Sequence, residues 1–318
     1  MLDSLLQAHE GLIIFLLAIF ASLGVRLSTL YHPNLILSLV FKAIAERVYR
    51  PKAASSYQLL SGTLGFFLPI LTITVLTYAI ISFAFYPNWL GGLVLFLCLD
   101  ISHESRAKRI SALIKSKQKV TARAVLQGMV ARDVEKLTEL GICKAAIDST
   151  ALNTLRHFFV IAVLYLAAGP YLALFYKLLL LCDHAWRQVM PPSTRFMASL
   201  SRVIWLIEFM PIRLLITCFS LLLRPKQTWH YIKYYGRHFS QTNTGWALSF
   251  FAANLHTQLA GPRFYFGERY DVMRVGAKAQ PSAEHIQHLL GLLNQMRWLF
   301  IATSALLLVI INFASLML

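Results

Sequence analysis

Residues 59–85 read LLSGTLGFFLPILTITVLTYAIISFAF, and this stretch contains no charged side chain. A helix needs about 20 apolar residues to cross the hydrocarbon core of a bilayer. Comparable apolar runs recur along the chain near 11–30, 155–182, 203–223 and 298–317, and a shorter run at 87–100 completes a hairpin with the first. The sequence therefore predicts an all-α, polytopic integral membrane protein with about five or six spans.

The composition agrees with this fold class. Hydrophobic residues make up 57% of the 318 positions and charged residues only 14%, against about 25% charged in an ordinary soluble domain. The net charge of +16 also occurs in nucleic-acid-binding proteins, but Lys and Arg accumulate in the cytoplasmic loops of membrane proteins. We therefore expect the lipid bilayer, and not nucleic acid, as the partner, and a single membrane domain over 1–318, compatible with a homo-oligomer.

The distribution of basic residues predicts the orientation. No Lys or Arg precedes the first apolar run, whereas the loop at 31–58 carries several. The polar segments 101–154 and 224–297 are also rich in Lys and Arg. Because cytoplasmic loops carry the excess of positive charge, we expect the N-terminus outside and both polar segments on the cytoplasmic face.

The segment 101–154 has the pattern of an amphipathic helix that packs on the membrane domain, because its apolar residues recur at three- and four-residue steps. These residues are Leu126, Met129, Val130, Val134 and Leu137. Gly141 predicts the end of this helix.

Two of the apolar runs are interrupted. Gly169 and Pro170 stand in the middle of 155–182, which predicts either one kinked helix or a re-entrant pair. Glu208 and Arg213 stand in 203–223 on either side of a proline. Charged residues at membrane depth mark either a functional site or a structural ion pair, and the sequence leaves both readings open.

The polar stretch 259–276, LAGPRFYFGERYDVMRVG, is the best candidate for a binding loop. Gly261 and Gly267 allow positive φ or the close approach of a ligand. Arg263 offers a planar fork for phosphate or carboxylate, and Tyr265 can stack on a flat ring. The alternative is an aromatic belt whose arginines contact lipid phosphates. Phosphate loops, metalloprotease motifs and nucleophile elbows are absent from the sequence.

A family resemblance starts at the stretch NTGWALSFFAANLHTQLAGPRFYFG, residues 243–267. It is similar to the Asn-x-Gly-Trp turn, helix and Gly-Gly-Pro-x-x-Tyr-x-Gly loop of the CobD/CbiB family of membrane proteins. YHPNLILSLVFKAIAERVYR at 31–50, ARAVLQGMVARDVEKLTELGICKAAIDSTALNT at 122–154 and FMPIRLL at 209–215 also resemble family segments in order and spacing.

The chain departs from the family pattern in its acidic motif. Where the family has Glu-x-x-Ala-Glu-Asn-x-x-Asp, this chain has Asp148, Leu152, Asn153 and Arg156, so that one carboxylate is shortened and two are lost. An apolar side chain cannot replace a carboxylate as a metal ligand.

The resemblance implies an adenosylcobinamide-phosphate synthase of cobalamin biosynthesis in the bacterial inner membrane. Such an enzyme joins an aminopropanol phosphate to adenosylcobyric acid through an ATP-dependent amide bond, with Mg²⁺ and ATP as cofactors and corrinoid and amino-alcohol phosphate as substrates. The catalytic residues implied are Asp133, Asp148, Asn153 and Asp183, with Asp148 and Asp183 as metal ligands. The implied substrate-binding residues are His32, Arg132, Arg213, Asn243, Gly245, Gly261, Arg263, Tyr265 and Gly267.

The lost carboxylates support a second hypothesis. A family member that kept the fold and lost the chemistry would act as a membrane sensor or regulatory protein, as in the related AmpE proteins. The retained loop at 259–276 favours the synthase, and the altered acidic motif favours the sensor.

Overall fold

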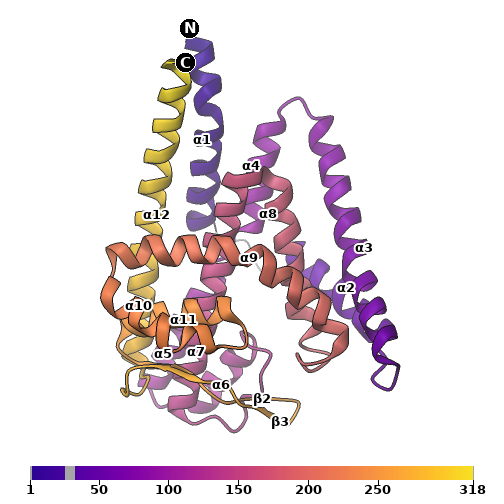
Figure 1. The fold of residues 1–318 in the computed structure, drawn as a ribbon, viewed down its shortest axis with the longest axis vertical. Coiled ribbons are helices and arrows are strands. Elements are labelled where there is room, and N and C mark those ends of the chain that lie inside the picture. The colour runs from indigo at the N-terminus through magenta and orange to yellow at the C-terminus, as the bar shows by residue number, and fades with distance from the viewer. Residues whose placement is uncertain (1, 26–32, 318) are drawn as a thin grey trace.

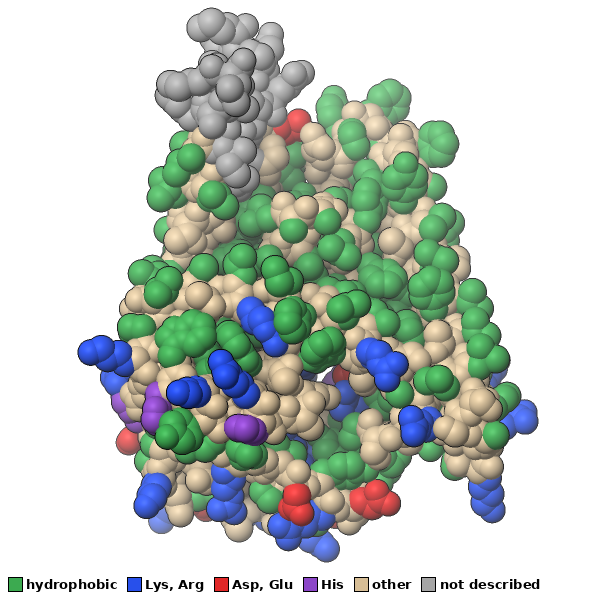
Figure 2. Space-filling view, viewed as in Figure 1, with side chains coloured by type: hydrophobic (Ala, Val, Ile, Leu, Met, Phe, Trp, Pro, Cys, Tyr) green, Lys and Arg blue, Asp and Glu red, His purple; other side chains and the backbone are tan. Residues whose placement is uncertain are grey.

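The structure of the protein is a computed structural model, and it describes residues 2–25 and 33–317. Helices dominate these residues, which confirms the predicted all-α membrane fold. Figure 1 shows long helices toward one end of the long axis, which we call the membrane part, and short helices and strands toward the other, which we call the polar part. Lys and Arg side chains gather over the polar part, while the opposite part of the viewed face is mainly apolar (Figure 2).

Helices α1 (Leu2–Gly24) and α12 (Ala283–Met317) run side by side, and both chain ends lie at the same end of the molecule (Figure 1). The rings of Phe20 and Trp298 pack 6.3 Å apart between them. Helices α3 (Ser55–Ser82) and α4 (Pro87–Cys98) form the predicted hairpin. Exposed leucines, valines and isoleucines cover α3, as expected for a helix that faces lipid.

The run at 155–182 folds as a helical hairpin. The chain here is helical over three consecutive elements, α7 (Glu139–Thr154), the π-helical turn η1 (Leu155–Val160) and α8 (Ile161–Trp186). It reverses direction within α8, where Ala168 and Gly169 leave helical geometry and Gly169 has a φ of 76°. After the turn, Tyr171 packs on Tyr78 near the end of α3, and Trp186 packs on Phe66 nearer its start. The second half of α8 therefore returns along α3 toward the polar part.

Helix α9 (Arg195–Leu222) is long and apolar enough to span a bilayer. Figure 1 nevertheless shows it crossing α1 and α12 instead of running along them. It packs against α3, α8 and α11 (Thr242–Leu255).

The polar part is built from short elements that pack on α7, α8 or α11. These elements are α2 (Pro33–Val48), α5 (Ser102–Lys115), α6 (Lys119–Gln127), α10 (Pro225–Tyr234) and the 3-10 turn η2 (Gly236–His238). Strand β1 (Gln258–Ala260) pairs antiparallel with β4 (Arg274–Gly276), and β2 (Arg263–Tyr265) pairs antiparallel with β3 (Glu268–Tyr270). The segments 101–154 and 224–297 touch here, because the Ser111 hydroxyl donates to the Ala283 carbonyl at 2.9 Å.

The predicted helix within 101–154 is interrupted. Helix α6 ends at Gln127, and residues 128–138 form turns before α7 begins at Glu139. Gly141 does not end a helix, because its N–H donates to the Thr138 hydroxyl and Thr138 thereby caps the start of α7. The helical spacing of apolar residues in the sequence continues through these turns because Met129 and Val134 are buried there, although neither is in a helix.

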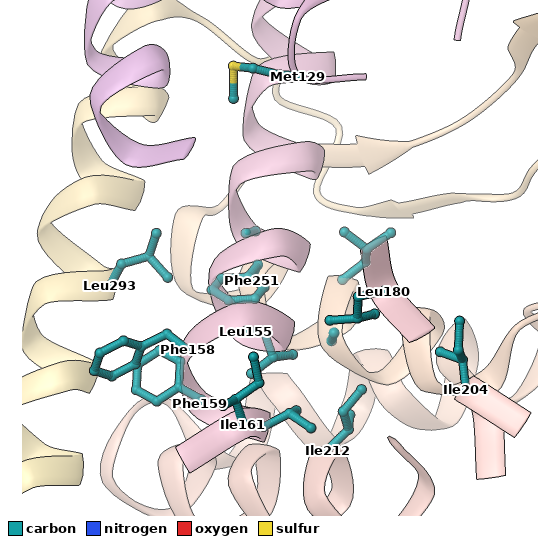
Figure 3. Packing of buried hydrophobic residues seen from close by; sticks show 14 of the residues in the cluster. Met129, Leu155, Phe158, Phe159, Ile161, Leu180, Ile204, Ile212, Phe251 and Leu293 are labelled. Atoms are coloured by element: carbon teal, nitrogen blue, oxygen red, sulfur yellow. The ribbon is translucent and has the colours of Figure 1, made fainter. Parts of the chain in front are cut away.

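The core lies where η1 meets the C-terminal helices (Figure 3). The ring of Phe159 meets the rings of Phe219 and Phe300 edge-on at 5.4 and 5.7 Å. A buried ion pair between Glu104 and Arg297 joins α5 to α12 at the border of this core. The core thus holds the ascending half of the α7–α8 hairpin in place.

Candidate functional site

A cavity of about 420 Å³ opens between α8, α9 and the start of α11. Figure 2 shows a hollow on the viewed face at the level where basic side chains begin to gather. Five of the lining residues carry charge, three of them arginines and two of them acids. The lining residues are Arg156, Leu180, Asp183, Arg187, Ser201, Arg202, Ile204, Trp205, Glu208, Ser240, Gln241, Asn243 and Thr244.

Arg156 and Glu208 form a buried ion pair on one wall of the cavity. Arg156 Nε lies 2.8 Å from Glu208 Oε1, and Arg156 Nη2 donates to Oε2 at 3.1 Å. The Tyr176 hydroxyl donates to the same carboxylate at 2.8 Å, and Glu208 is only 1% exposed. This network satisfies a carboxylate that would otherwise be costly to bury.

Asp183 and Arg187 form a second ion pair one turn apart on α8. Arg187 Nε and Nη2 donate to the two Asp183 oxygens at 2.7 and 2.8 Å. Burial lowers the pKa of Arg187, but the charge of Asp183, the hydrogen bonds to it and Tyr265 together raise the pKa above its ordinary value. Arg202 also lines the cavity, and no hydrogen bond or ion pair engages it among the described residues. The five charged groups leave one net positive charge, so the cavity suits an anion.

Arg213 and Asn243, two predicted substrate-binding residues, meet beside the cavity. Arg213 Nη1 donates to Asn243 Oδ1 at 2.8 Å, and Asn243 Nδ2 donates to the Trp205 carbonyl at 2.8 Å. The guanidinium of Arg213 lies over the Phe209 ring. An ion pair between Glu208 and Arg213 is not formed, because residues five apart project from different sides of a helix.

Gly245, also predicted to bind substrate, serves close packing. A Cβ at this position would lie 2.6 Å from the Gly236 carbonyl oxygen and 2.6 Å from the Phe239 Cβ. The absence of a side chain brings the start of α11 against η2, and this contact positions Asn243 and Thr244 at the cavity.

A second polar cluster joins α7 to the loop at 259–276. Asp148 is 2% exposed, and its Oδ1 accepts the Ala260 N–H at 3.1 Å. Its Oδ2 lies 3.5 Å from Arg263 and 4.0 Å from Arg132. Burial and the neighbouring Arg263 lower the pKa of Arg132 to about 10, although Asp148 acts in the opposite direction. Three predicted site residues therefore share one ion-paired cluster.

Asp133 fixes the tip of the β2–β3 hairpin. Its Oδ2 accepts the Gly267 N–H at 2.9 Å, and its own N–H donates to the Phe264 carbonyl at 2.9 Å. Gly261 and Gly267 have φ of 105° and 79°, as predicted for glycines in such a loop. Asp133 therefore anchors backbone, and the hairpin is ordered by the preceding segment.

The hairpin lies between the two clusters. The ring of Tyr265 packs edge-on against Tyr270 at 5.3 Å, and the Tyr270 and Ser193 hydroxyls lie 3.0 Å apart. Ser193 belongs to the loop between α8 and α9. Tyr265 is close enough to interact electrostatically with both Arg132 and Arg187.

Asn153 belongs to a third group, because its Nδ2 donates to the Ser149 hydroxyl at 3.0 Å and lies 3.4 Å from His103 Nδ1. Nearby, Lys177 Nζ lies 3.2 Å from His157 Nδ1. His32 lies outside the described residues. The predicted catalytic residues are thus distributed over three groups.

The placement of the carboxylates does not fit a bound Mg²⁺. Asp148 does not line the cavity that Asp183 lines, and both carboxylates already accept from arginine. In the described part of the chain, no three His, Cys, Asp or Glu side chains are grouped to hold a metal ion. A resident metal would have to compete with arginine for each of these oxygens.

Sequence reasoning missed Arg202, Gln241 and Thr244 as cavity residues, grouped Arg187 with Asp183 without assigning it to a site, and treated Arg156 only as a departure from the family. A signal was present for Arg156. It stands at the head of an apolar run, where a charge is expensive and needs a partner. No pattern in the sequence paired it with Glu208.

The chain matches known proteins along most of its length. The sequence model of a family described as CobD/Cbib protein matches residues 15–293. The chain is 26% identical over 233 residues to a protein of Stutzerimonas stutzeri named "Cobalamin biosynthesis protein CobD", and the match covers 73% of this chain and 77% of that protein.

Proteins with the same name from Synechocystis and Chromobacterium violaceum are 28% and 25% identical, each over 183 residues. These two matches cover 55% and 58% of this chain and 54% and 59% of the relatives. No solved structure matches the chain.

Proposed function

The chain belongs to the CobD/CbiB family, and from this premise we propose that it acts in cobalamin biosynthesis, joining an amino-alcohol phosphate to the carboxylate of a corrinoid through an ATP-dependent amide bond. Relatives that share its sequence are named for cobalamin biosynthesis. The polar part, with its basic surface, lies on the cytoplasmic side of the inner membrane in this proposal, which follows the excess of Lys and Arg there.

The cavity lined by Arg156, Arg187 and Arg202 is the observation that supports this function best. Both substrates carry anionic groups, a carboxylate on the corrinoid and a phosphate on the amino alcohol. Guanidinium groups bind such groups through paired N–H donors. Arg202 has all its donors free of partners in the described structure, so we assign it the first contact with phosphate.

Arg156 and Arg187 stabilise the site from its walls. Arg187 donates to Asp183 through Nε and Nη2, and Arg156 donates to Glu208 through Nη2. Arg213 holds Asn243 in place, and Asn243 lines the cavity. The bound anion would thus be held by arginines whose positions are fixed by buried acids.

The loop at 259–276 would close the cavity on the side of α8. Tyr265, whose ring packs on Tyr270, would offer an aromatic face to the corrin or to a nucleotide. ATP supplies the activation of the carboxylate that amide formation requires. Any divalent ion would arrive with the nucleotide phosphates, because Asp148 and Asp183 are engaged by arginine.

The ion pair between Arg156 and Glu208 favours a second candidate function, a binding protein without turnover. The resemblance places a carboxylate of the family's acidic motif where this chain has Arg156, and Arg156 pairs with an acid from another helix. A chain altered in this way would keep the anion site and lose the catalytic acids, and it would act as a membrane sensor of corrinoids.

One experiment distinguishes the two functions. Purified chain in detergent would be incubated with adenosylcobyric acid, aminopropanol phosphate and Mg-ATP, and the amide product followed by mass spectrometry, with corrinoid binding measured in parallel. Product formation supports the synthase. Binding without product selects the sensor, and neither binding nor product rejects both.

A further inference from the structure

The exposed face of α9 is apolar along most of its length. Leu206, Met210, Leu214 and Leu221 follow one another at steps of four, four and seven residues and are 55 to 70% exposed. Cys218 is exposed on the same side. No charged side chain interrupts this stripe, which we call the α9 stripe. A continuous apolar strip of this kind on a surface marks a contact with lipid or protein.

The opposite face of α9 forms the cavity. Ile204 and Glu208 line the cavity, and Leu206 stands between them in sequence. Because neighbouring helical residues are rotated by about 100°, positions two apart project in nearly opposite directions. Most of the α9 stripe therefore points away from the cavity, and Arg202, one turn before Leu206, lies at the border between the two.

Basic residues form one edge of the α9 stripe. Arg195, Arg202 and Arg213 stand at seven- and eleven-residue steps, so they share one side of the helix, beside Leu206. Arg195 and Arg202 are exposed. An apolar face bordered by arginines is typical of helices that lie in the plane of a membrane interface, where the basic groups meet lipid phosphates.

Both ends of α9 contact the polar part. The loop before α9 reaches the β2–β3 hairpin, where the Ser193 and Tyr270 hydroxyls lie 3.0 Å apart. After α9, helix α10 packs on α11, and α11 packs on β1 and β4. A helix whose two ends lie on the same side has not crossed a bilayer. Figure 1 agrees, because α9 runs across the direction of α1 and α12.

We propose that α9 lies flat in the membrane interface, with the α9 stripe inserted among the lipids of the leaflet next to the polar part, and that it roofs the anion cavity from that leaflet. The lipid-facing surface of α3 adjoins this surface, because α3 packs against α9 and its own outward residues are apolar. The cavity would thus lie at the level of the membrane surface, and α9 would separate it from the lipid.

Depth measurements with nitroxide labels test this arrangement. Single cysteines at Leu206, Met210, Leu214 and Leu221 would be labelled in a Cys218→Ser background, in vesicles of phosphatidylethanolamine and phosphatidylglycerol. The other three cysteines are buried, so the unsubstituted background should take up no label. Collision rates with oxygen and with a water-soluble nickel complex report the depth of each label.

Helix α3 provides the matched control. Leu60, Leu68 and Val75 are exposed on α3, which is long and apolar enough to span the bilayer, so the depths of labels there should change progressively. The four α9 labels should instead share one shallow depth. A spanning α9 would separate Leu206 from Leu221 by about 22 Å of depth, at 1.5 Å per residue.

Two results would overturn the proposal. A graded series along α9 would show that the helix crosses the bilayer. Four labels that collide freely with the nickel complex and poorly with oxygen would place the α9 stripe in water. Neither result depends on the substrate, so the proposed activity is tested separately.

Discussion

Arg156 at the foot of the α7–α8 hairpin and Glu208 in the middle of α9 form a paired contact, with N to O distances of 2.8 and 3.1 Å. They are 52 residues apart and come together because the hairpin reverses at Gly169. The pair joins the membrane hairpin to the helix that covers the cavity. Arg156 is also one of the three arginines that distinguish this cavity from a site built of carboxylates alone.

Removing Arg156 should destabilise the protein strongly. Arg156→Ala leaves Glu208 buried without its cation, and breaking a buried pair in this way costs about 3–5 kcal/mol. Thermal unfolding in detergent measures the loss. The double variant Arg156→Leu, Glu208→Leu should recover most of it, and a single variant as stable as the parent would contradict the role given to the pair.

Asp148 should hold the loop at 259–276 in place. Asp148→Ala removes the acceptor of the Ala260 N–H and the partner of Arg263, with an expected cost of about 2–4 kcal/mol. Hydrogen exchange should rise in β1 and β2. Asp271→Ala is the control, because Asp271 is 75% exposed and its pair with Arg269 is at the surface. Equal exchange in both variants would refute the anchoring role.

Gly245→Ala should disturb the contact between α11 and η2. The added Cβ would lie 2.6 Å from a backbone oxygen that cannot move aside easily, so we expect a loss of about 1–3 kcal/mol. Gly291→Ala is the matched control on α12, since no atom lies within 4 Å of its Cβ position, and it should be neutral or stabilising by about 1 kcal/mol. Thermal unfolding of the two variants checks this prediction: Gly245→Ala should lower the unfolding temperature, and Gly291→Ala should not.

His103 should make the fold sensitive to acid. Burial is the main cause that lowers the pKa of His103 to about 4. The nearby charges of Arg106, His184 and Lys177 act in the same direction, and the Asp100 carboxylate opposes them. The unfolded chain binds this proton near its ordinary pKa of about 6.5 and the folded chain does not. Stability is therefore lost as pH falls from about 6.5 toward 4, by at most about 3 kcal/mol. His103→Gln should flatten the pH dependence of unfolding in this window, and an unchanged slope would contradict it.

The sequence predicted the membrane class because apolar runs of bilayer length are a direct physical requirement. It also singled out Arg132, Asp148 and Arg263, which the structure places in one cluster. It did not pair Arg156 with Glu208, because that pairing depends on the reversal at Gly169, where the sequence allowed a kink or a hairpin.

The orientation of α9 and the break at 128–138 were also beyond the sequence. Hydropathy measures how apolar a helix is and not its angle to the bilayer, so 203–223 reads as a span whether it crosses or lies flat. Buried residues in a turn can continue a helical period by coincidence, as Met129 and Val134 do.

The anion cavity is tested most directly by equilibrium binding of aminopropanol phosphate to the purified protein and to Arg202→Ala. Arg202 has no partner in the described structure, so its loss should leave the unfolding temperature unchanged while weakening binding about 10- to 100-fold, the equivalent of one charged hydrogen-bonding group. Arg195→Ala, an exposed arginine on the same edge of α9 that does not line the cavity, should bind as the parent does. Equal affinity of Arg202→Ala and the parent would contradict the assignment of this cavity as the substrate site.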